Sequence, residues 1–123
     1  MTTRGIRGAT TINSDTRENV LAATRELLDA ILVANPGLNI EDIASAIFTT
    51  TEDIVSAFPA LAARQMGWDQ VPMINAREIP VSKSLPLCIR VLISWNTDKK
   101  QNAIRHIYLW EAVNLRPDLA PNN

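Results

Sequence analysis

The sequence predicts a single α+β domain in which a mixed β-sheet carries its helices on one face. The 123 residues fit one domain with a modest core. Strand-like and helix-like patterns follow one another in the order β-α-(α)-β-α-β-β-β, and the apolar, β-branched stretch 87–95 is typical of a central strand. Several predicted strands have apolar residues on both faces. We therefore expect the face without helices to be buried against other subunits.

Composition narrows the classes of protein to which this chain can belong. The chain has 20% charged residues, a net charge of −1 and no run of Lys or Arg. Nucleic acid is therefore not an expected partner. No apolar stretch approaches the ~20 residues of a membrane-spanning helix, and the N-terminal pattern is not that of a signal peptide. We expect no membrane contact and a cytoplasmic location. Cys88 is the only cysteine, and its apolar surroundings favour a core residue over a nucleophile.

The first part of the chain predicts a strand followed by a long helix. The strand is expected over residues 4–12, where Gly5 and Gly8 are typical of a bulge or of a close approach by another group. Asp15 has capping-box spacing with the glutamate three residues later, so the helix should run from about residue 16 to 34. Its apolar stripe belongs to the core and consists of Val20, Thr24, Leu27, Leu28 and Ile31.

The middle of the chain predicts a helix between two strands. A short helix over 41–45 and a strand over 46–51 are expected first. Pro59 stands in the first turn of the next helix, which ends at Gly67. A strand over 71–76 follows, and the proline within it restricts it to a sheet edge or a strand start.

The last part of the chain predicts two further strands and a tail. After the central strand, a polar turn is expected over 96–101 and a last strand over 104–110. We interpret residues 1–116 as the domain and residues 117–123 as a flexible C-terminal tail.

Arg90 is out of place in the middle of an apolar strand. Side chains alternate along a strand, so Arg90 shares a face with Leu92 and Ser94. Burial of an unpaired guanidinium costs roughly several kcal/mol. Arg90 therefore needs a carboxylate partner, a route to solvent or an anionic ligand, and a structural salt bridge is the simplest of these interpretations.

Residue content excludes several kinds of catalytic site. One His and one Cys cannot form a zinc site, and the chain has no P-loop, GxGxxG or GxSxG motif. What remains is a set of arginines in or beside apolar strands, one carboxylate and one phenol. Such a set suits a small dianionic metabolite and lacks a good general base for proton transfer. Its members are Arg4, Arg7, Arg90, Glu78 and Tyr108.

Short motifs in one order over nearly the whole chain resemble the small monofunctional chorismate mutases of the Bacillus type. They are RGIRGATT (4–11), FPA (58–60), GW (67–68), VP (71–72), CIRV (88–91), IRHIYL (104–109) and LRPDL (115–119). The resemblance implies an isomerase that rearranges chorismate to prephenate on the route to phenylalanine and tyrosine. It also implies a homotrimer in which three subunits form a pseudo-α/β barrel with active sites at their interfaces, without cofactor or metal.

The same resemblance implies a role for particular residues. Arg90 looks like the main catalytic group, directed at the ether oxygen that gains negative charge. Arg7 resembles the arginine that holds a substrate carboxylate, and Glu78 resembles the glutamate that accepts from the ring hydroxyl. Tyr108 resembles a tyrosine that donates to a carboxylate. The other expected binding residues are Phe58, Arg64, Met73, Ile74, Asn75, Leu115 and Arg116, of which Phe58, Met73 and Ile74 would come from the neighbouring subunit and Arg116 would begin a segment that closes over the ligand.

Two departures from the family pattern stand near the expected site. Leu61 occupies a position where relatives have a lysine, and Asn75 occupies one where they often have a cysteine. We expect activity with a changed KM. Three other readings stay open: a trimeric module that binds an aromatic-pathway acid without catalysis, a related trimeric deaminase, and a structural domain in which Arg90 pairs with an internal carboxylate.

Overall fold

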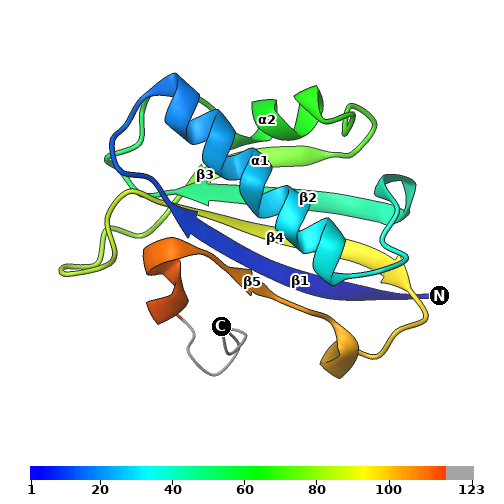
Figure 1. Ribbon diagram of the computed structural model, residues 1–123. Helices are drawn as coiled ribbons and strands as arrows, with labels where there is room; N and C mark the ends of the chain where they lie inside the picture. The colour runs from blue at the N-terminus through cyan, green and yellow to red at the C-terminus, as the bar shows by residue number, and fades with distance from the viewer. Residues whose placement is uncertain (116–123) are drawn as a thin grey trace.

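The computed structural model describes residues 1–115 (Figure 1). Arg116 and the predicted tail lie outside the described residues. The elements follow the predicted order, with three short 3-10 helices between and after them. They are β1 (Thr2–Thr11), α1 (Arg17–Ala34), η1 (Ile40–Asp42), β2 (Ile43–Thr50), α2 (Pro59–Gln65), β3 (Met73–Arg77), β4 (Cys88–Thr97), η2 (Gln101–Ala103), β5 (Ile107–Tyr108) and η3 (Trp110–Asn114).

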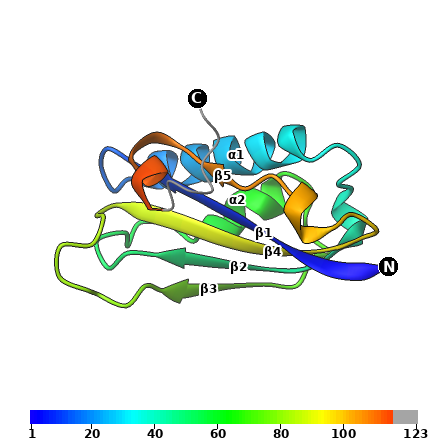
Figure 2. The ribbon, with the colours of Figure 1, turned by 90° about the horizontal axis from the view of Figure 1, so that it is seen from below.

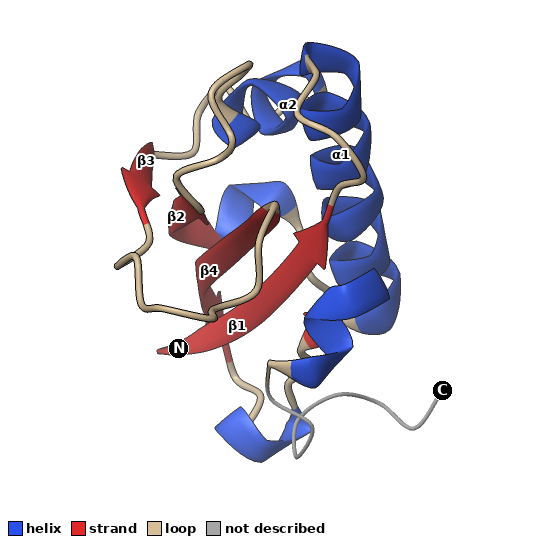
Figure 3. Cartoon of the chain, turned by 90° about the vertical axis from the view of Figure 1, so that its left-hand side faces the viewer, coloured by secondary structure: helices blue, strands red, loops and turns tan. Residues whose placement is uncertain are grey.

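The five strands form one mixed sheet in the order β3-β2-β4-β1-β5. β4 runs antiparallel to both of its neighbours, whereas β3 and β5 pair in parallel with β2 and β1. Both helices lie on the same face of the sheet (Figure 2), and a view along the sheet shows α1 and α2 on one side of the strands (Figure 3). The predicted α+β fold is confirmed: stretch 87–95 is central, and β3, which begins directly after Pro72, lies at an edge.

The core lies between α1, α2 and the sheet. The predicted apolar stripe of α1 is buried throughout. β1 pairs with β4 without a bulge, and α1 packs closely on it at Gly8, because a Cβ added there would lie 2.8 Å from Ile31 Cδ1 and 3.0 Å from Val91 Cγ1. Gly8 therefore marks a close approach. The large buried side chains of this core include Ile6, Leu27, Leu28, Ile31, Phe48, Trp68 and Ile93.

The cap of α1 differs from the prediction. Thr16 is the N-cap, and its hydroxyl accepts from the Asn19 N–H at 3.1 Å. Asp15 instead accepts from the backbone N–H of Val55 at 3.0 Å and from the Ser56 hydroxyl at 2.6 Å. The Ser56 hydroxyl, followed by the Val55 N–H, lowers the pKa of Asp15. Both candidate residues can cap a helix, and the contact with a distant loop decides between them.

Two other elements are shorter than expected. The helix predicted over 41–45 is the single turn η1, and β2 already begins at Ile43 with a register shift before Ser45. The last strand is reduced to the two residues of β5: it begins after η2 and its C-cap Ile104, and it ends early because Trp110 has a φ of 54° and starts η3. A positive φ is incompatible with a continuing strand.

Candidate active site

Alternation along β4 separates two kinds of side chain. Ile89 and Val91 face the helices and are buried, whereas Leu92 lies on the opposite face and is 45% exposed. Arg90 also lies on this opposite face, called the open face below, and its side chain is 44% exposed. The open face continues onto β2, where Ile47 is exposed. The central strand thus carries its arginine on the side of the sheet opposite α1 and α2.

Arg90 has both a carboxylate partner and a route to solvent. Its Nε lies 3.3 Å from Oε2 of Glu78, whose side chain is 23% exposed. Glu78 directly follows β3, and its N–H donates to the Thr50 carbonyl at 2.9 Å, which fixes the start of the loop. Thr49, the cross-strand neighbour of Arg90, donates its hydroxyl to the same Oε2 atom. The Nε of Arg90 is buried and has no hydrogen-bond partner in the described chain.

Arg7 and Tyr108 approach the same area from β1 and β5. Arg7 pairs with Leu92 in the sheet, so its exposed side chain is on the open face. Its backbone N–H donates to Nδ1 of His106 at 2.9 Å, which ties the two segments together. Tyr108 is buried beside Ala9, and the partly buried Leu85 and Leu115 pack over this cluster.

These residues line one hollow of about 300 Å³. A volume of this size suits a small ligand. The hollow combines two cationic side chains, a carboxylate and a phenol with apolar walls, which is the chemistry needed to recognise a small dianion. Its lining residues are Arg7, Gly8, Ala9, Ile47, Thr49, Glu78, Arg90, Val91, Leu92 and Tyr108.

The remaining predicted site residues lie around α2 and β3. Phe58 and Asn75 line a second hollow of about 470 Å³, and Oδ1 of Asn75 accepts from the N–H of Ala60 at 3.2 Å. Arg64 is exposed in the last turn of α2. Within one chain, this group does not share the hollow of Arg90. The two β3 side chains diverge, since Met73 packs on the core and Ile74 is exposed.

Six residues that line the Arg90 hollow were not predicted as site residues: Gly8, Ala9, Ile47, Thr49, Val91 and Leu92. The pattern of β2 alone marks Thr49 as an ordinary strand residue. Its place opposite Arg90 follows only from the strand register, which no local signal in the sequence specifies.

Comparison with known proteins identifies the family to which this chain belongs. Residues 3–119 match the family model for chorismate mutase type I. The chain belongs to the type I chorismate mutase family. The match spans nearly the whole sequence, as do the motifs on which the predicted resemblance rests.

Named relatives agree with this assignment. A chorismate mutase AroH from Thermus thermophilus is 59% identical over 116 residues, which are 94% of this chain and 95% of that protein. The chorismate mutase AroH of Bacillus subtilis (strain 168) is 43% identical over 121 residues, covering 98% of this chain and 94% of that protein. A solved chorismate mutase structure from Clostridium thermocellum superposes with a TM-score of 0.85 at 46% identity, covering 88% of this chain and 96% of that one. The resemblance is confirmed, and this chorismate mutase is an isomerase.

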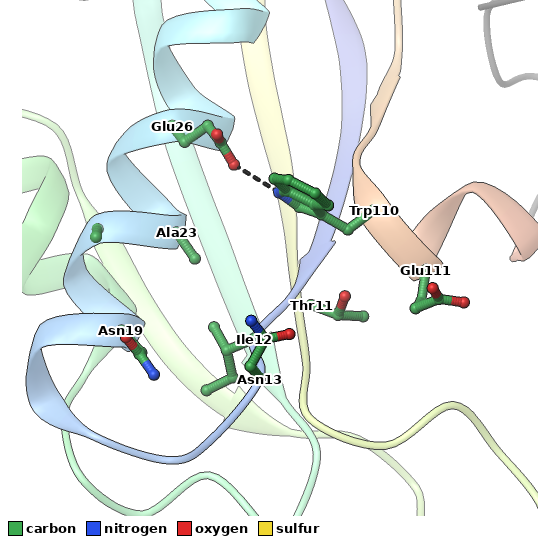
Figure 4. A pocket seen from close by; sticks show the side chains of 9 residues that line it. Thr11, Ile12, Asn13, Asn19, Ala23, Glu26, Trp110 and Glu111 are labelled. Atoms are coloured by element: carbon green, nitrogen blue, oxygen red, sulfur yellow. Dashed lines mark hydrogen bonds between the residues drawn. The ribbon is translucent and has the colours of Figure 1, made fainter.

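A further hollow of this chorismate mutase, of about 300 Å³, lies between α1 and η3 (Figure 4). The Trp110 indole N–H crosses to α1 and donates to Oε1 of Glu26 at 2.8 Å. Asn19 and Glu111 also line this hollow. No residue lines both this hollow and the Arg90 hollow, so the two hollows are separate features of the surface.

Cys88 is a buried thiol, as predicted. Burial raises its pKa to about 11, an effect that the positive charge of Arg90 opposes. The thiol is therefore protonated near neutral pH and is a poor nucleophile. Within residues 1–115, no group of three His, Cys, Asp or Glu side chains is placed to hold a metal ion.

Over the same described part of the chain, no helix combines the length and apolar character needed to cross a membrane.

Proposed function

We propose that the hollow lined by Arg7, Glu78, Arg90 and Tyr108 is the site at which this chorismate mutase rearranges chorismate to prephenate. The observation that carries the proposal is the convergence of these four side chains, from β1, β4, β5 and the end of β3, on one hollow of the open face. Chorismate has two carboxylates, an ether oxygen and a ring hydroxyl. The hollow offers a donor or an acceptor for each of these groups.

The reaction needs electrostatic stabilisation and positioning. One ether C–O bond breaks while one C–C bond forms within the same molecule, and no proton or leaving group departs. Negative charge develops on the ether oxygen in the transition state. A fixed guanidinium at Arg90 stabilises that charge more than it stabilises the ground state, which is the condition for a faster chemical step.

The other three side chains bind and orient the substrate in this proposal. Arg7 binds one carboxylate, and the Tyr108 hydroxyl donates to a carboxylate. Glu78 accepts from the ring hydroxyl and faces the ring carbons that gain positive character. Holding the substrate in its reactive, compact conformer supplies the rest of the rate enhancement.

We further propose that the active site is completed by a neighbouring subunit of a homotrimer. The expected residues Phe58, Ile74 and Asn75 lie outside the hollow of their own chain. Exposed Ile47 and Leu92 make the open face apolar, which supports burial against another copy. The pseudo-barrel assembly, the closing tail and the cytoplasmic location stay predictions.

The test of the proposed site replaces Arg90 by citrulline, which keeps the shape of the side chain and removes its charge. Chorismate loss and prephenate formation are followed by absorbance. We expect turnover by the unmodified protein and a fall of at least roughly 10²–10³-fold in the citrulline protein, with an unchanged circular dichroism spectrum. Equal rates would refute the role of Arg90, and no turnover by folded unmodified protein would favour the binding module.

The test of the shared site mixes two inactive variants. Arg90→Ala removes the main catalytic group, and Phe58→Asp places a negative charge on the wall proposed to come from the neighbour. Refolded together in equal amounts, random trimers should regain about one quarter of the unmodified activity, because about that share of sites has both walls intact. Mixed samples as inactive as each variant alone would show that each chain builds its site by itself.

A further inference from the structure

Thr49 stands at the junction of the proposed catalytic residues. It faces Arg90 across the β2–β4 pairing, and its hydroxyl donates to Oε2 of Glu78. The same oxygen lies 3.3 Å from Nε of Arg90. One carboxylate oxygen is thus shared between a neutral hydroxyl and a guanidinium.

This sharing leaves the ion pair incomplete. An arginine and a carboxylate usually form two parallel hydrogen bonds, each with a short N–O distance. Here Arg90 and Glu78 show a single 3.3 Å approach, and the buried Nε of Arg90 has no hydrogen-bond partner in the described chain. The hydroxyl of Thr49 competes with this N–H as a donor to the same carboxylate oxygen.

We propose that Thr49 is a positioning residue that holds the Glu78 carboxylate out of full pairing with Arg90. The inference rests on the proposed function of the hollow. In the empty site, Thr49 keeps the guanidinium of Arg90 available to an oxygen of the ligand. In the occupied site, it orients Glu78, whose second oxygen then accepts from the substrate hydroxyl.

Loss of the Thr49 hydroxyl should let the site pair with itself. Without a competing donor, the Glu78 carboxylate rotates into a two-point contact with Arg90, and the ligand must break that contact to bind. The free enzyme is then stabilised relative to the complex. The expected result is a higher KM with a smaller change in kcat.

The first test is steady-state kinetics of Thr49→Val, which keeps the side-chain shape and the strand propensity. We expect KM for chorismate to rise roughly tenfold and kcat to change by less than about threefold. Thr49→Ser, which restores a hydroxyl, should recover most of the KM. If Thr49→Val folds poorly, Thr49→Ala replaces it in the same comparison. An unchanged KM in the folded variant would overturn the inference.

A matched control separates this effect from the general loss of a hydroxyl hydrogen bond. Thr3 lies near the other end of the sheet, and its hydroxyl donates to Oδ1 of Asn96 at 2.6 Å. Thr3→Val should leave KM within about twofold of the unmodified value. A similar KM rise in both variants would show a structural effect and contradict the role of Thr49.

A double-mutant cycle tests whether Thr49 acts through Glu78. Calorimetry with prephenate measures binding in Thr49→Val, Glu78→Ala and the double variant. We expect Thr49→Val to weaken binding roughly tenfold in the unmodified protein and to have no effect once Glu78 is alanine. If the effects of Thr49→Val and Glu78→Ala on binding were additive, the role of Thr49 would be overturned, and the proposed function of the hollow would still stand. If Glu78→Ala neither weakened binding nor slowed turnover, the proposed function of the hollow would fail instead.

Discussion

The two faces of the sheet differ in what their side chains do, although the same strands carry both. On the helix-covered face, Ile89, Val91 and Ile93 are buried and pack into the core. On the open face, Arg90 and Leu92 alternate with them and stay accessible. Because side chains of a strand point alternately to opposite faces, neighbouring residues can carry stability and chemistry independently. In β4, residues that stabilise the core therefore alternate with residues that face the proposed site.

The open face is not uniform. Near its end, Cys88 shares the face of Arg90 and is still almost fully buried at 1% exposed. The Cys88 N–H donates to the Thr51 hydroxyl at 3.0 Å, and the Thr51 N–H donates to the Cys88 carbonyl at 3.1 Å, directly after β2 ends. The open face thus has a solvent-exposed part, where Arg7 lies, and a buried part, where burial raises the pKa of the Cys88 thiol to about 11.

The first prediction concerns the buried surroundings of Cys88 and the pH dependence of stability. Burial raises the pKa of Cys88 from 9.0 to about 11 in the folded state, so the folded protein holds its thiol proton more tightly than the unfolded chain does. This contribution is fully present below pH 9 and is lost as pH rises toward 11. Urea unfolding should show about 2 kcal/mol more loss between pH 8 and 11 for the unmodified protein than for Cys88→Ala. If the unfolding free energies of the two proteins fell in parallel over this pH range, the buried environment of Cys88 would be contradicted.

The second prediction compares two glycines on opposite faces of β1. A Cβ at Gly8 would lie within 3.0 Å of side chains in the core, whereas one at Gly5 would meet Leu92 Cδ1 at an ordinary 3.6 Å. Gly8→Ala should lower the free energy of unfolding by about 1–3 kcal/mol through overpacking. Gly5→Ala should leave it unchanged or raise it by up to about 1 kcal/mol. Equal losses in thermal unfolding would show that the two faces are packed alike.

The third prediction concerns the surface contact between η3 and α1. Trp110→Phe removes the indole N–H that bonds Glu26, and the expected loss is about 0.5–1 kcal/mol because the indole is 68% exposed. Glu26→Gln keeps an acceptor and should lose less. A loss of unfolding free energy above about 2 kcal/mol for Trp110→Phe, measured by urea unfolding, would show that this contact stabilises the protein more than an exposed hydrogen bond does.

Much of the fold follows from local patterns in the sequence. The periodicity of α1 and the prolines and glycines around α2 predict both helices to within about two residues. The apolar, β-branched stretch around Ile89 identifies the central strand. The N-cap choice between Asp15 and Thr16 depends on a loop forty residues away, which local patterns do not contain. The end of β5 depends on the positive φ of Trp110, which no pattern specified.

The candidate site also contains residues that the sequence identifies and residues that only the tertiary structure reveals. Arg90 is identifiable from the sequence because a charge within an apolar strand needs a partner or a ligand. Residue content also singles out Arg7, Glu78 and Tyr108, and the family resemblance assigns them roles. The structure brings these three to one hollow with Arg90. Thr49 enters the site through cross-strand register and the direction of its hydroxyl, which are tertiary properties. Residues that act by holding another side chain leave the weakest trace in a sequence.

The most direct test of the separation between the two faces uses adjacent residues of β4. Ile89→Ala acts on the buried face, where Ile89 is 0% exposed, and Arg90→Met acts on the open face. Both variants are measured for urea unfolding and for chorismate turnover per folded molecule.

We predict that Ile89→Ala loses about 2–5 kcal/mol of unfolding free energy while its folded fraction keeps turnover within about threefold. Arg90→Met should lose turnover by at least roughly 10²–10³-fold while its unfolding free energy changes by less than about 1 kcal/mol. The opposite pattern, or stability and turnover falling together in both variants, would contradict the assignment of stability to one face and chemistry to the other.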